Sequence, residues 1–233
     1  MFIANLYNSE VKKEEMGGFI NFLKEFKFKI VLVRIFRVLL IGAIIVDIIS
    51  FNWLNLFNAT LALLVTYIPN FLSKKHLLYI PSDIQVIIIT FVFASLYLGE
   101  MRAFYYRFWW WDTMLHTFSG VILGFIGFIL IYFLNHEEDI DLLLSPLFIA
   151  IFAFTFAVSI GVVWEIFEFS MDSFFAFNMQ KTGLVDTIWD LIADCVGGGI
   201  AAYFGYNYLK RGLPSYFEKA TRKILIRNSQ FFD

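Results

Sequence analysis

Long apolar stretches dominate this sequence and decide most of what it can fold into. Lipid cannot hydrogen-bond an exposed backbone, so a chain that crosses a bilayer needs helices of about 20 mostly apolar residues. Six stretches meet this condition, at residues 31–50, 53–72, 82–99, 112–134, 146–171 and 186–209. Only 16% of the residues are charged, against about 25% in soluble domains. We predict an all-α, polytopic membrane helical bundle with about six transmembrane helices, located in the cell membrane.

The two ends of the chain are more polar than the stretches between them. Residues 19–30 place apolar side chains at helical spacing with lysines between them, which is typical of a helix lying on a membrane surface. We therefore predict an interfacial amphipathic segment over 1–30, a six-helix transmembrane domain over 31–209 and a basic cytoplasmic tail over 210–233. A soluble stub is the alternative for the first of these segments.

The distribution of Lys and Arg predicts which way the helices run, because cytoplasmic loops are enriched in both. With the N-terminus inside, fifteen of the 18 Lys and Arg residues fall on the cytoplasmic side, and the outer side keeps Arg102, Arg107 and Lys181. Both termini are therefore expected in the cytoplasm. No basic excess supports nucleic-acid binding. The single cysteine, Cys195, lies in an apolar stretch and is expected to serve packing.

Three of the predicted helices carry polar side chains along one face, each at the end predicted to lie outside. An α-helix advances about 100° per residue, so side chains three or four residues apart share a face. The helix at 112–134 has such a stripe at its start, the helix at 146–171 at its end, and the helix at 186–209 at its start. The nine residues are Asp112, His116, Ser119, Glu165, Glu168, Asp172, Asp186, Asp190 and Asp194.

Small residues predict how these helices pack. On the last helix the aspartate stripe continues toward the cytoplasm as small residues spaced four apart, and the helix at 112–134 has a similar run of glycines. Small residues let helix backbones approach closely in lipid. The two runs are Ala193, Gly197, Ala201, Gly205 and Gly120, Gly124, Gly127. We expect a polar pocket open only to the outside, with a tight helix contact beneath it.

The depth of each ionisable group separates two interpretations. Asp112 and Asp186 could cap their helices, and Asp172 could be solvated at a helix exit. His116, Glu168 and Asp190 lie about one turn inside, and Glu165 and Asp194 about two. An ionisable side chain at such depth is costly unless paired and marks a functional site by default. His116, Glu168 and Asp190 are the predicted catalytic residues.

The excess of acids in this region points to a cation. Seven carboxylates face only three basic residues, so at least four negative charges are left over. Either several acids stay protonated or cations lie among them. A histidine with carboxylates suits Zn²⁺ or Mn²⁺, oxygen ligands alone suit Mg²⁺ or Ca²⁺, and acid–base chemistry without a metal stays open. The candidate ligands of a divalent metal cation are Asp112, His116, Glu165, Glu168, Asp186, Asp190 and Asp194.

An aromatic run precedes the first of the polar helices. Residues 104–111 read Phe-Tyr-Tyr-Arg-Phe-Trp-Trp-Trp, and Trp and Tyr favour the headgroup level of a bilayer. Most of this run is expected to anchor the chain in the membrane. Arg102 and Arg107 could bind lipid phosphate beside the acidic pocket.

The three polar motifs together carry a family resemblance. Asp-x-x-x-His-x-x-Ser-Gly, Trp-Glu-x-x-Glu-x-x-x-Asp and Asp-Thr-x-x-Asp-x-x-x-Asp-x-x-Gly occur in this order between about Pro81 and Gly205. The chain resembles the YjdF-like family of uncharacterised bacterial and archaeal membrane proteins, and more distantly the VanZ-like proteins. The latter usually have Asn where this chain has Asp194. The resemblance implies a compact helical bundle with the acidic and His positions as its signature, and no reaction, substrate or metal.

Three functions follow as hypotheses. The first is an enzyme or binder of a lipid headgroup or lipid-linked small molecule at the outer leaflet, using an acid/His site that holds a divalent cation. The others are a proton- or cation-coupled transporter and a non-catalytic membrane scaffold. The site hypothesis requires the last three helices to cluster. It also requires oxygens of Asp190 and Glu168 within about 8 Å of a His116 ring nitrogen, the span of one cation or two waters. The oligomeric state is left open.

Overall fold

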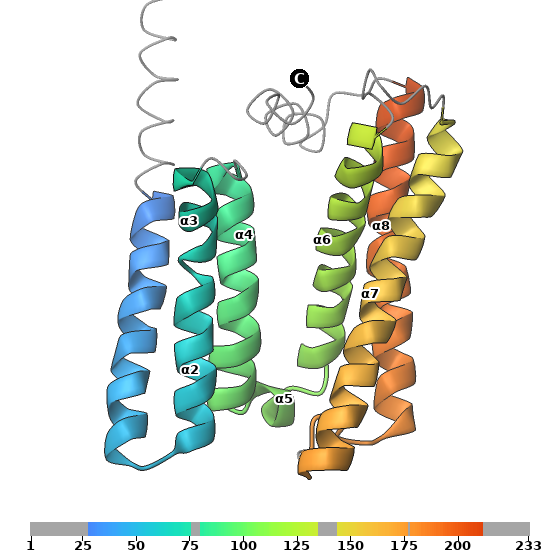
Figure 1. Ribbon diagram of the computed structural model, residues 1–233. Coiled ribbons are helices and arrows are strands. Elements are labelled where there is room, and N and C mark those ends of the chain that lie inside the picture. The colour runs from blue at the N-terminus through green and yellow to red at the C-terminus, as the bar shows by residue number, and fades with distance from the viewer. Residues whose placement is uncertain (1–27, 76–79, 135–143, 177, 212–233) are drawn as a thin grey trace, which may run out of the picture. The chain divides into compact units, whose positions relative to one another are not determined.

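The structure is a computed structural model that describes residues 28–75, 80–134, 144–176 and 178–211. In these ranges every regular element is a helix, as predicted. The first helix, at 28–49, is followed by α2 (Trp53–Val65), α3 (Ile68–Lys74), α4 (Ser82–Val92), the π-helix η1 (Phe93–Met101), α5 (Phe104–Arg107), α6 (Trp111–Leu134), α7 (Pro146–Phe175) and α8 (Leu184–Arg211) (Figure 1). Most of the predicted interfacial segment at 1–30, the polar break at 135–141 between the predicted spans 112–134 and 146–171, and most of the basic tail at 210–233 lie outside the described residues.

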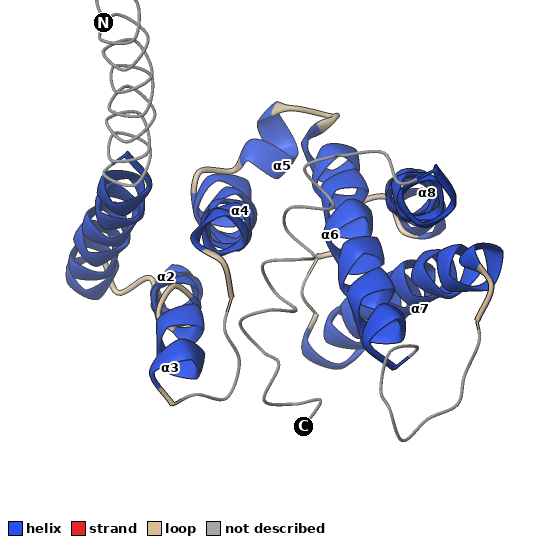
Figure 2. Ribbon diagram, turned by 90° about the horizontal axis from the view of Figure 1, so that it is seen from above, coloured by secondary structure: helices blue, strands red, loops and turns tan. Residues whose placement is uncertain are grey.

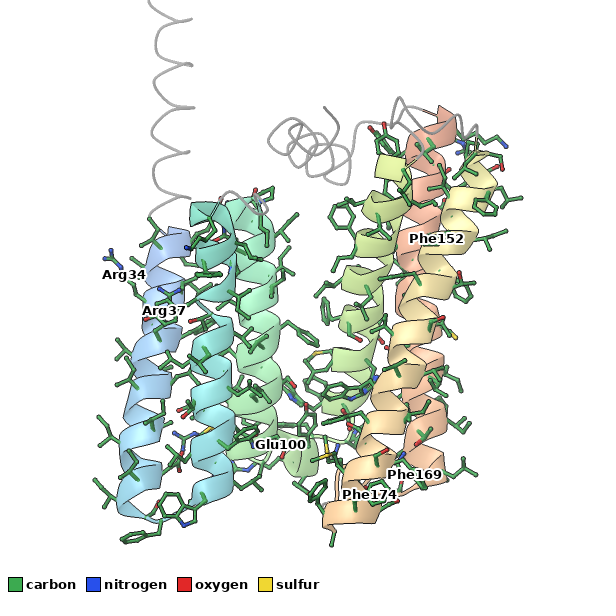
Figure 3. The ribbon with its side chains drawn as sticks, in the orientation of Figure 1. Arg34, Arg37, Glu100, Phe152, Phe169 and Phe174 are labelled. Carbon is green, nitrogen blue, oxygen red and sulfur yellow. The ribbon has the colours of Figure 1, made fainter. Side chains whose placement is uncertain are left out.

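Three of the described helical stretches are long and apolar enough to cross a membrane. They are Ser82–Met101, Trp111–Tyr132 and Pro146–Phe175, and Trp53–Val65 is a shorter apolar helix. Many large apolar side chains lie on the outside, for example Phe174 at 80% and Phe169 at 60% exposure on α7 (Figure 3). Lipid is the solvent that suits such a surface. The chain is an all-α membrane protein, and the count of six spans stays a prediction.

The described chain forms two compact units. The first contains the first helix, α2, α4 and the start of η1, because its residues come from 28–71 and Ser82–Tyr97. Within this unit α2 contacts α4, and the rings of Phe36 and Phe93 stack with centroids 4.1 Å apart.

The predicted span at 53–72 is wrong as a single helix, because it breaks at Thr66 and Tyr67 between α2 and α3. The Thr66 hydroxyl donates back to the Leu63 carbonyl at 2.7 Å. The guanidinium of Arg37, on the first helix, donates to the Thr66 carbonyl oxygen at 2.7 Å and to Thr66 Oγ1 at 3.0 Å. Pro69 follows and has no N–H to continue the helical ladder.

The third predicted span is confirmed in place, but its second half is the π-helix η1 rather than an α-helix. Gly99 lies in η1 where the ring of Tyr105 packs against the backbone. A Cβ at Gly99 would come within 2.4 Å of Tyr105 Cε2, so a larger residue would push the ring away.

The second unit is built on α6, α7 and α8, which contact one another in all three pairs (Figure 2). The predicted clustering of these three helices is therefore confirmed. Ser145 caps α7 by accepting the Phe148 N–H at 3.2 Å, and Pro146 occupies the first turn. A closely packed apolar core lies where the end of α6 meets the start of α7, and it consists of Phe128, Ile131, Ile149 and Ala153.

Candidate functional site

The site is assembled from one end of each helix of the second unit: the start of α6, the end of α7 and the start of α8. His116 lies on α6 one turn after Asp112 and is 8% exposed. Its imidazole ring is the centre of the arrangement, because four carboxylates from the three helices lie within 4.0 Å of its two nitrogens.

One ring nitrogen of His116 is occupied by Asp194 of α8. Nδ1 lies 3.3 Å from Asp194 Oδ2, and the Ser119 hydroxyl lies 3.0 Å from Asp194 Oδ1. Asp194 is 1% exposed, so its carboxylate is held between two α6 side chains away from solvent. A carboxylate on one ring nitrogen orients a histidine and directs the other nitrogen to a ligand.

The other ring nitrogen, Nε2, faces three carboxylates at once. It lies 3.9 Å from Asp112 Oδ1, 3.9 Å from Glu165 Oε1 and 3.9 Å from Asp190 Oδ2. These distances are too long for direct hydrogen bonds. They are short enough for both atoms of a pair to ligate one ion at about 2.1 Å each.

Several of these acids are buried without a hydrogen-bond partner. Glu165 is 4% exposed and Asp190 2%. Within the described part of the chain Asp190 Oδ2 makes no hydrogen bond, and neither oxygen of Glu165 has a partner at hydrogen-bond geometry, although Thr187 lies near it. A buried carboxylate costs several kcal/mol unless its charge is compensated. A proton or a bound cation is therefore needed at this point.

Close backbone packing brings the three stripes together. A Cβ at Gly197 of α8 would lie 2.1 Å from the Thr117 carbonyl oxygen of α6, and one at Gly120 would lie 2.6 Å from the Asp194 carbonyl oxygen. Further along the helices, away from the site, an ideal Cβ at Gly124 would lie 2.6 Å from Ala201 Cβ, and one at Gly205 would lie 2.6 Å from the Phe128 ring. The predicted contact of these small residues beneath the site is confirmed.

A loop between α7 and α8 brings a lysine to the site. Asp172 accepts the backbone N–H groups of Met179 and Gln180 at 2.7 and 2.8 Å, and the Gln180 amide donates to Thr187 at 2.8 Å. These bonds hold the following residue, Lys181, whose ammonium pairs with Asp112 and lies 4.2 Å from the Tyr105 ring centre. Asp172 is therefore a loop cap, rather than simply solvated.

The other predicted site residues lie around this centre with different roles. Glu168 is partly buried one turn beyond Glu165, and its Oε1 accepts the Trp164 indole N–H at 2.9 Å. Asp186 is partly buried and its Oδ2 is without a partner in the described chain. The capping expectation is wrong for Asp112 and Asp186, because α6 begins at Trp111 and α8 at Leu184, so both acids lie inside the first turn.

The geometric prediction is thus confirmed for Asp190, which lies 3.9 Å from His116 Nε2. The candidate metal ligands that lie closest together are Asp112, His116 and Asp190, with one ligand atom of each within 4.8 Å of the others. For Glu168 the distance to His116 stays a prediction, and its Oε1 is bonded to Trp164.

Sequence reasoning missed Gly161, which shapes the site. A Cβ at Gly161 would lie 2.2 Å from Asp194 Oδ2, so this glycine makes the space for the buried carboxylate. The sequence does contain a signal for Gly161: small residues at every fourth position of α7 lead up to Glu165, at Ala153, Ala157 and Gly161.

The aromatic run before α6 is divided by the fold. Trp109 is 88% exposed and Tyr106 66%, as expected of side chains at a membrane surface. Trp111 is 9% exposed and packs edge-on against Phe104 with centroids 4.9 Å apart. The exposed residues Tyr106 and Trp109 are therefore the part of the run suited to the predicted anchoring, and Trp111 fixes the start of α6.

Comparisons with known proteins agree with the motif resemblance. The family described as "Predicted membrane protein (DUF2238)" matches residues 28–211. A curated relative from Thermotoga maritima, described as "Uncharacterized protein", is 29% identical over 119 residues. That match covers 51% of this chain and 59% of the relative, so the chain spans about three fifths of the relative's length.

No solved structure matches the chain. The likeness to VanZ-like proteins is not shown by these matches and stays a resemblance in motifs. The family match covers all the described helices and all the residues of the site. The chain therefore belongs to the predicted membrane protein family DUF2238.

Proposed function

We propose that the site formed by α6, α7 and α8 binds a divalent cation. His116 Nε2, Asp112 and Asp190 are the primary ligands, Glu165 is the further carboxylate within reach, and Asp194 orients the histidine. The observation that carries this proposal is the position of Nε2, 3.9 Å from three carboxylates of which two are at most 4% exposed. One cation would compensate these charges together.

The proposed ligand of this cation is the headgroup of a lipid or of a lipid-linked small molecule. The site lies at the end of α6 that follows the exposed aromatic residues Tyr106 and Trp109, which favour headgroup depth. A divalent cation there would polarise a phosphoryl or carbonyl oxygen. Glu168 is the candidate for proton transfer beside it, because His116 and Asp190, the other two predicted catalytic residues, serve as ligands of the cation.

The orientation belongs to the same proposal. In a multi-pass arrangement in the cell membrane with both termini in the cytoplasm, the site faces the outer leaflet. A reporter fused after residue 211 and a cysteine label placed at Thr182 test this, with the fusion expected inside and the label expected outside.

Metal analysis is the direct test of the cation. Protein purified in detergent, treated with chelator and reloaded with Mg²⁺, Mn²⁺, Zn²⁺ or Ca²⁺ is expected to bind at least one of them stoichiometrically and to melt at a higher temperature. His116→Gln should weaken this binding about 100-fold or more, since it removes the central ligand. Asp47→Asn is the matched control, because Asp47 is another buried acid, 6% exposed, on the first helix.

Absence of binding to all four cations, or an equal loss in His116→Gln and Asp47→Asn, would reject the cation site. A protonated His116 bonded to the acids would then be the remaining account of the geometry.

Lipid analysis tests the proposed ligand. Wild-type protein and Glu165→Gln are placed in identical phospholipid nanodiscs with and without the bound cation, and the lipids are compared by mass spectrometry. A cation-dependent change or retention of one headgroup class in the wild type alone supports the proposal. Identical lipid profiles for the two proteins overturn the lipid function and leave the cation site standing.

The transporter hypothesis is less well supported by the packing. A relay needs polar groups that continue across the membrane. Along α8 the buried residues between Asp194 and Asn207 are glycines and alanines: Gly197, Gly198, Ala201 and Gly205.

A further inference from the structure

A second polar region lies in the first unit and has the opposite charge. A cavity of about 240 Å³ lies between the first helix and the start of α4. Its charged lining comes from Lys29, Arg34 and Arg37, and Ser82 and Gln85 add polar groups from α4. Figure 3 shows the two arginines at the same end of the first helix.

The positive charge of this cavity is only partly compensated. Lys29 pairs with Asp83. In the described residues no carboxylate pairs with Arg34 or Arg37. Arg37 donates two of its five N–H groups to the neutral oxygens of Thr66, which leaves three. The guanidinium is also held against the Tyr67 ring, 3.9 Å from its centre, so its position is fixed before any ligand arrives.

The remaining lining indicates what kind of anion fits. Ile30, Val33, Val86 and Ile89 make the rest of the wall apolar. An inorganic ion gains nothing from such a wall, but the glycerol and first acyl carbons of a phospholipid bury against it. Basic pockets between membrane helices on the cytoplasmic side are suited to anionic headgroups.

The geometry points to a binding site for a lipid phosphate in this cavity. We propose that the phosphate of an anionic phospholipid binds between Arg34 and the three remaining N–H groups of Arg37, with its glycerol on the apolar wall. The phosphate comes from the leaflet marked as cytoplasmic by the excess of Lys and Arg. The lining of this cavity includes no residue of the acidic site of α6–α8, and the two proposals share only the orientation of the chain.

The test measures lipid binding to purified protein with a defined variant pair. Thermal midpoints in detergent are titrated with phosphatidylglycerol, with phosphatidylcholine and with inorganic phosphate. Wild type is expected to be stabilised by phosphatidylglycerol more than by phosphatidylcholine. Arg34→Gln should raise the apparent Kd for phosphatidylglycerol about fivefold, the equivalent of about 1 kcal/mol for one basic group at an anionic surface.

Two further variants keep the outcome decisive. Arg34→Lys keeps the charge and should retain most of the binding, and Arg211→Gln removes one exposed basic residue from the end of α8 and should change nothing. Equal loss in Arg34→Gln and Arg211→Gln, or no preference for phosphatidylglycerol, overturns the proposal. Stabilisation by inorganic phosphate without stabilisation by the lipid overturns the lipid as the source of the anion.

Discussion

The α6–α8 bundle and the unit built on the first helix, α2 and α4 both consist of helices, but they pack by different means. In the bundle, backbones touch through glycine: a Cβ at Gly120 or Gly197 would lie within 2.6 Å of a backbone oxygen of another helix. In the other unit, Gly42 of the first helix has no atom within 4 Å of its ideal Cβ. There the contacts come from side chains, such as the stacked Phe36 and Phe93 and the Arg37–Thr66 bonds.

The two units pack differently because they bury different sets of ionisable side chains. Three buried stripes of ionisable residues can face one point only if their helices approach closely, and glycine allows that in lipid. The other unit buries Asp47 at 6% exposure, while Lys29 and Asp83 have side chains 27% and 30% exposed, so it has no set of buried ionisable residues from three helices to bring to one point. Close packing in this chain therefore marks the site that must exclude solvent.

The largest effect is expected at Gly197. Gly197→Ala places a Cβ against the Thr117 carbonyl oxygen, and neither backbone can yield without separating α6 from α8. We expect a loss of about 3 kcal/mol in stability, at the upper end for overpacking. Thermal unfolding in detergent measures it. A stable Gly197→Ala protein that still binds cations would contradict the packing described for the bundle.

Neutralising one buried acid should raise the stability of the protein without the cation and lower it, relative to wild type, with the cation. Asp190→Asn removes one negative charge from a group of four around His116 and nearly conserves the side-chain volume. In chelator the variant should be more stable than wild type by about 1 kcal/mol, because a functional site is not optimised for stability. With the cation present the order should reverse. Melting in both conditions checks the reversal, and destabilisation in chelator would show that the acids serve assembly alone.

Removing the lysine at the site should have a smaller effect of the opposite sign on binding. Lys181 holds Asp112, and Lys181→Met would release this carboxylate for a cation. Since both side chains are about one fifth exposed, we expect only about a fivefold gain in cation affinity. Titration calorimetry of this variant and of Lys210→Met, a lysine at the far end of α8, compares the two. Weaker binding in Lys181→Met would mean that Lys181 organises the site rather than competing for it.

The smallest effect is expected in the other unit. Gly42→Ala fills open space on an exposed helix face and should leave the melting temperature unchanged or raise stability by about 0.5 kcal/mol. Paired with Gly197→Ala, it makes one comparison: the same substitution in two units with opposite outcomes. Destabilisation of both to a similar degree would remove the distinction drawn between them.

The sequence was sufficient for the parts of this fold that depend on one helix at a time. Hydropathy gave the places of the helices, and spacing of Asp112, His116, Asp190 and Asp194 gave the faces that meet. Small residues such as Gly197 gave the contact between them, because in lipid a glycine stripe has few other uses.

What could not be predicted depends on partners from other helices. Pro69 signals a break near Thr66, but the bonds from Arg37 to the carbonyl and hydroxyl oxygens of Thr66 come from another helix. The π-helix η1 could not be foreseen from apolar composition, which is alike for α and π turns. Lys181 was counted only as a nearby charge, since its approach to Asp112 depends on a loop that is held by Asp172 and Gln180.

The break between α2 and α3 also changes how one charge should be counted in the orientation of the chain. The guanidinium of Arg37 donates to the backbone carbonyl oxygen of Thr66 at this break, so it is a structural part of the helix pair. A charge used in this way moves with its helices whichever way the chain is inserted, and it carries no information on sidedness. Without Arg37, fifteen minus one leaves fourteen basic residues against three, so the predicted orientation does not depend on it.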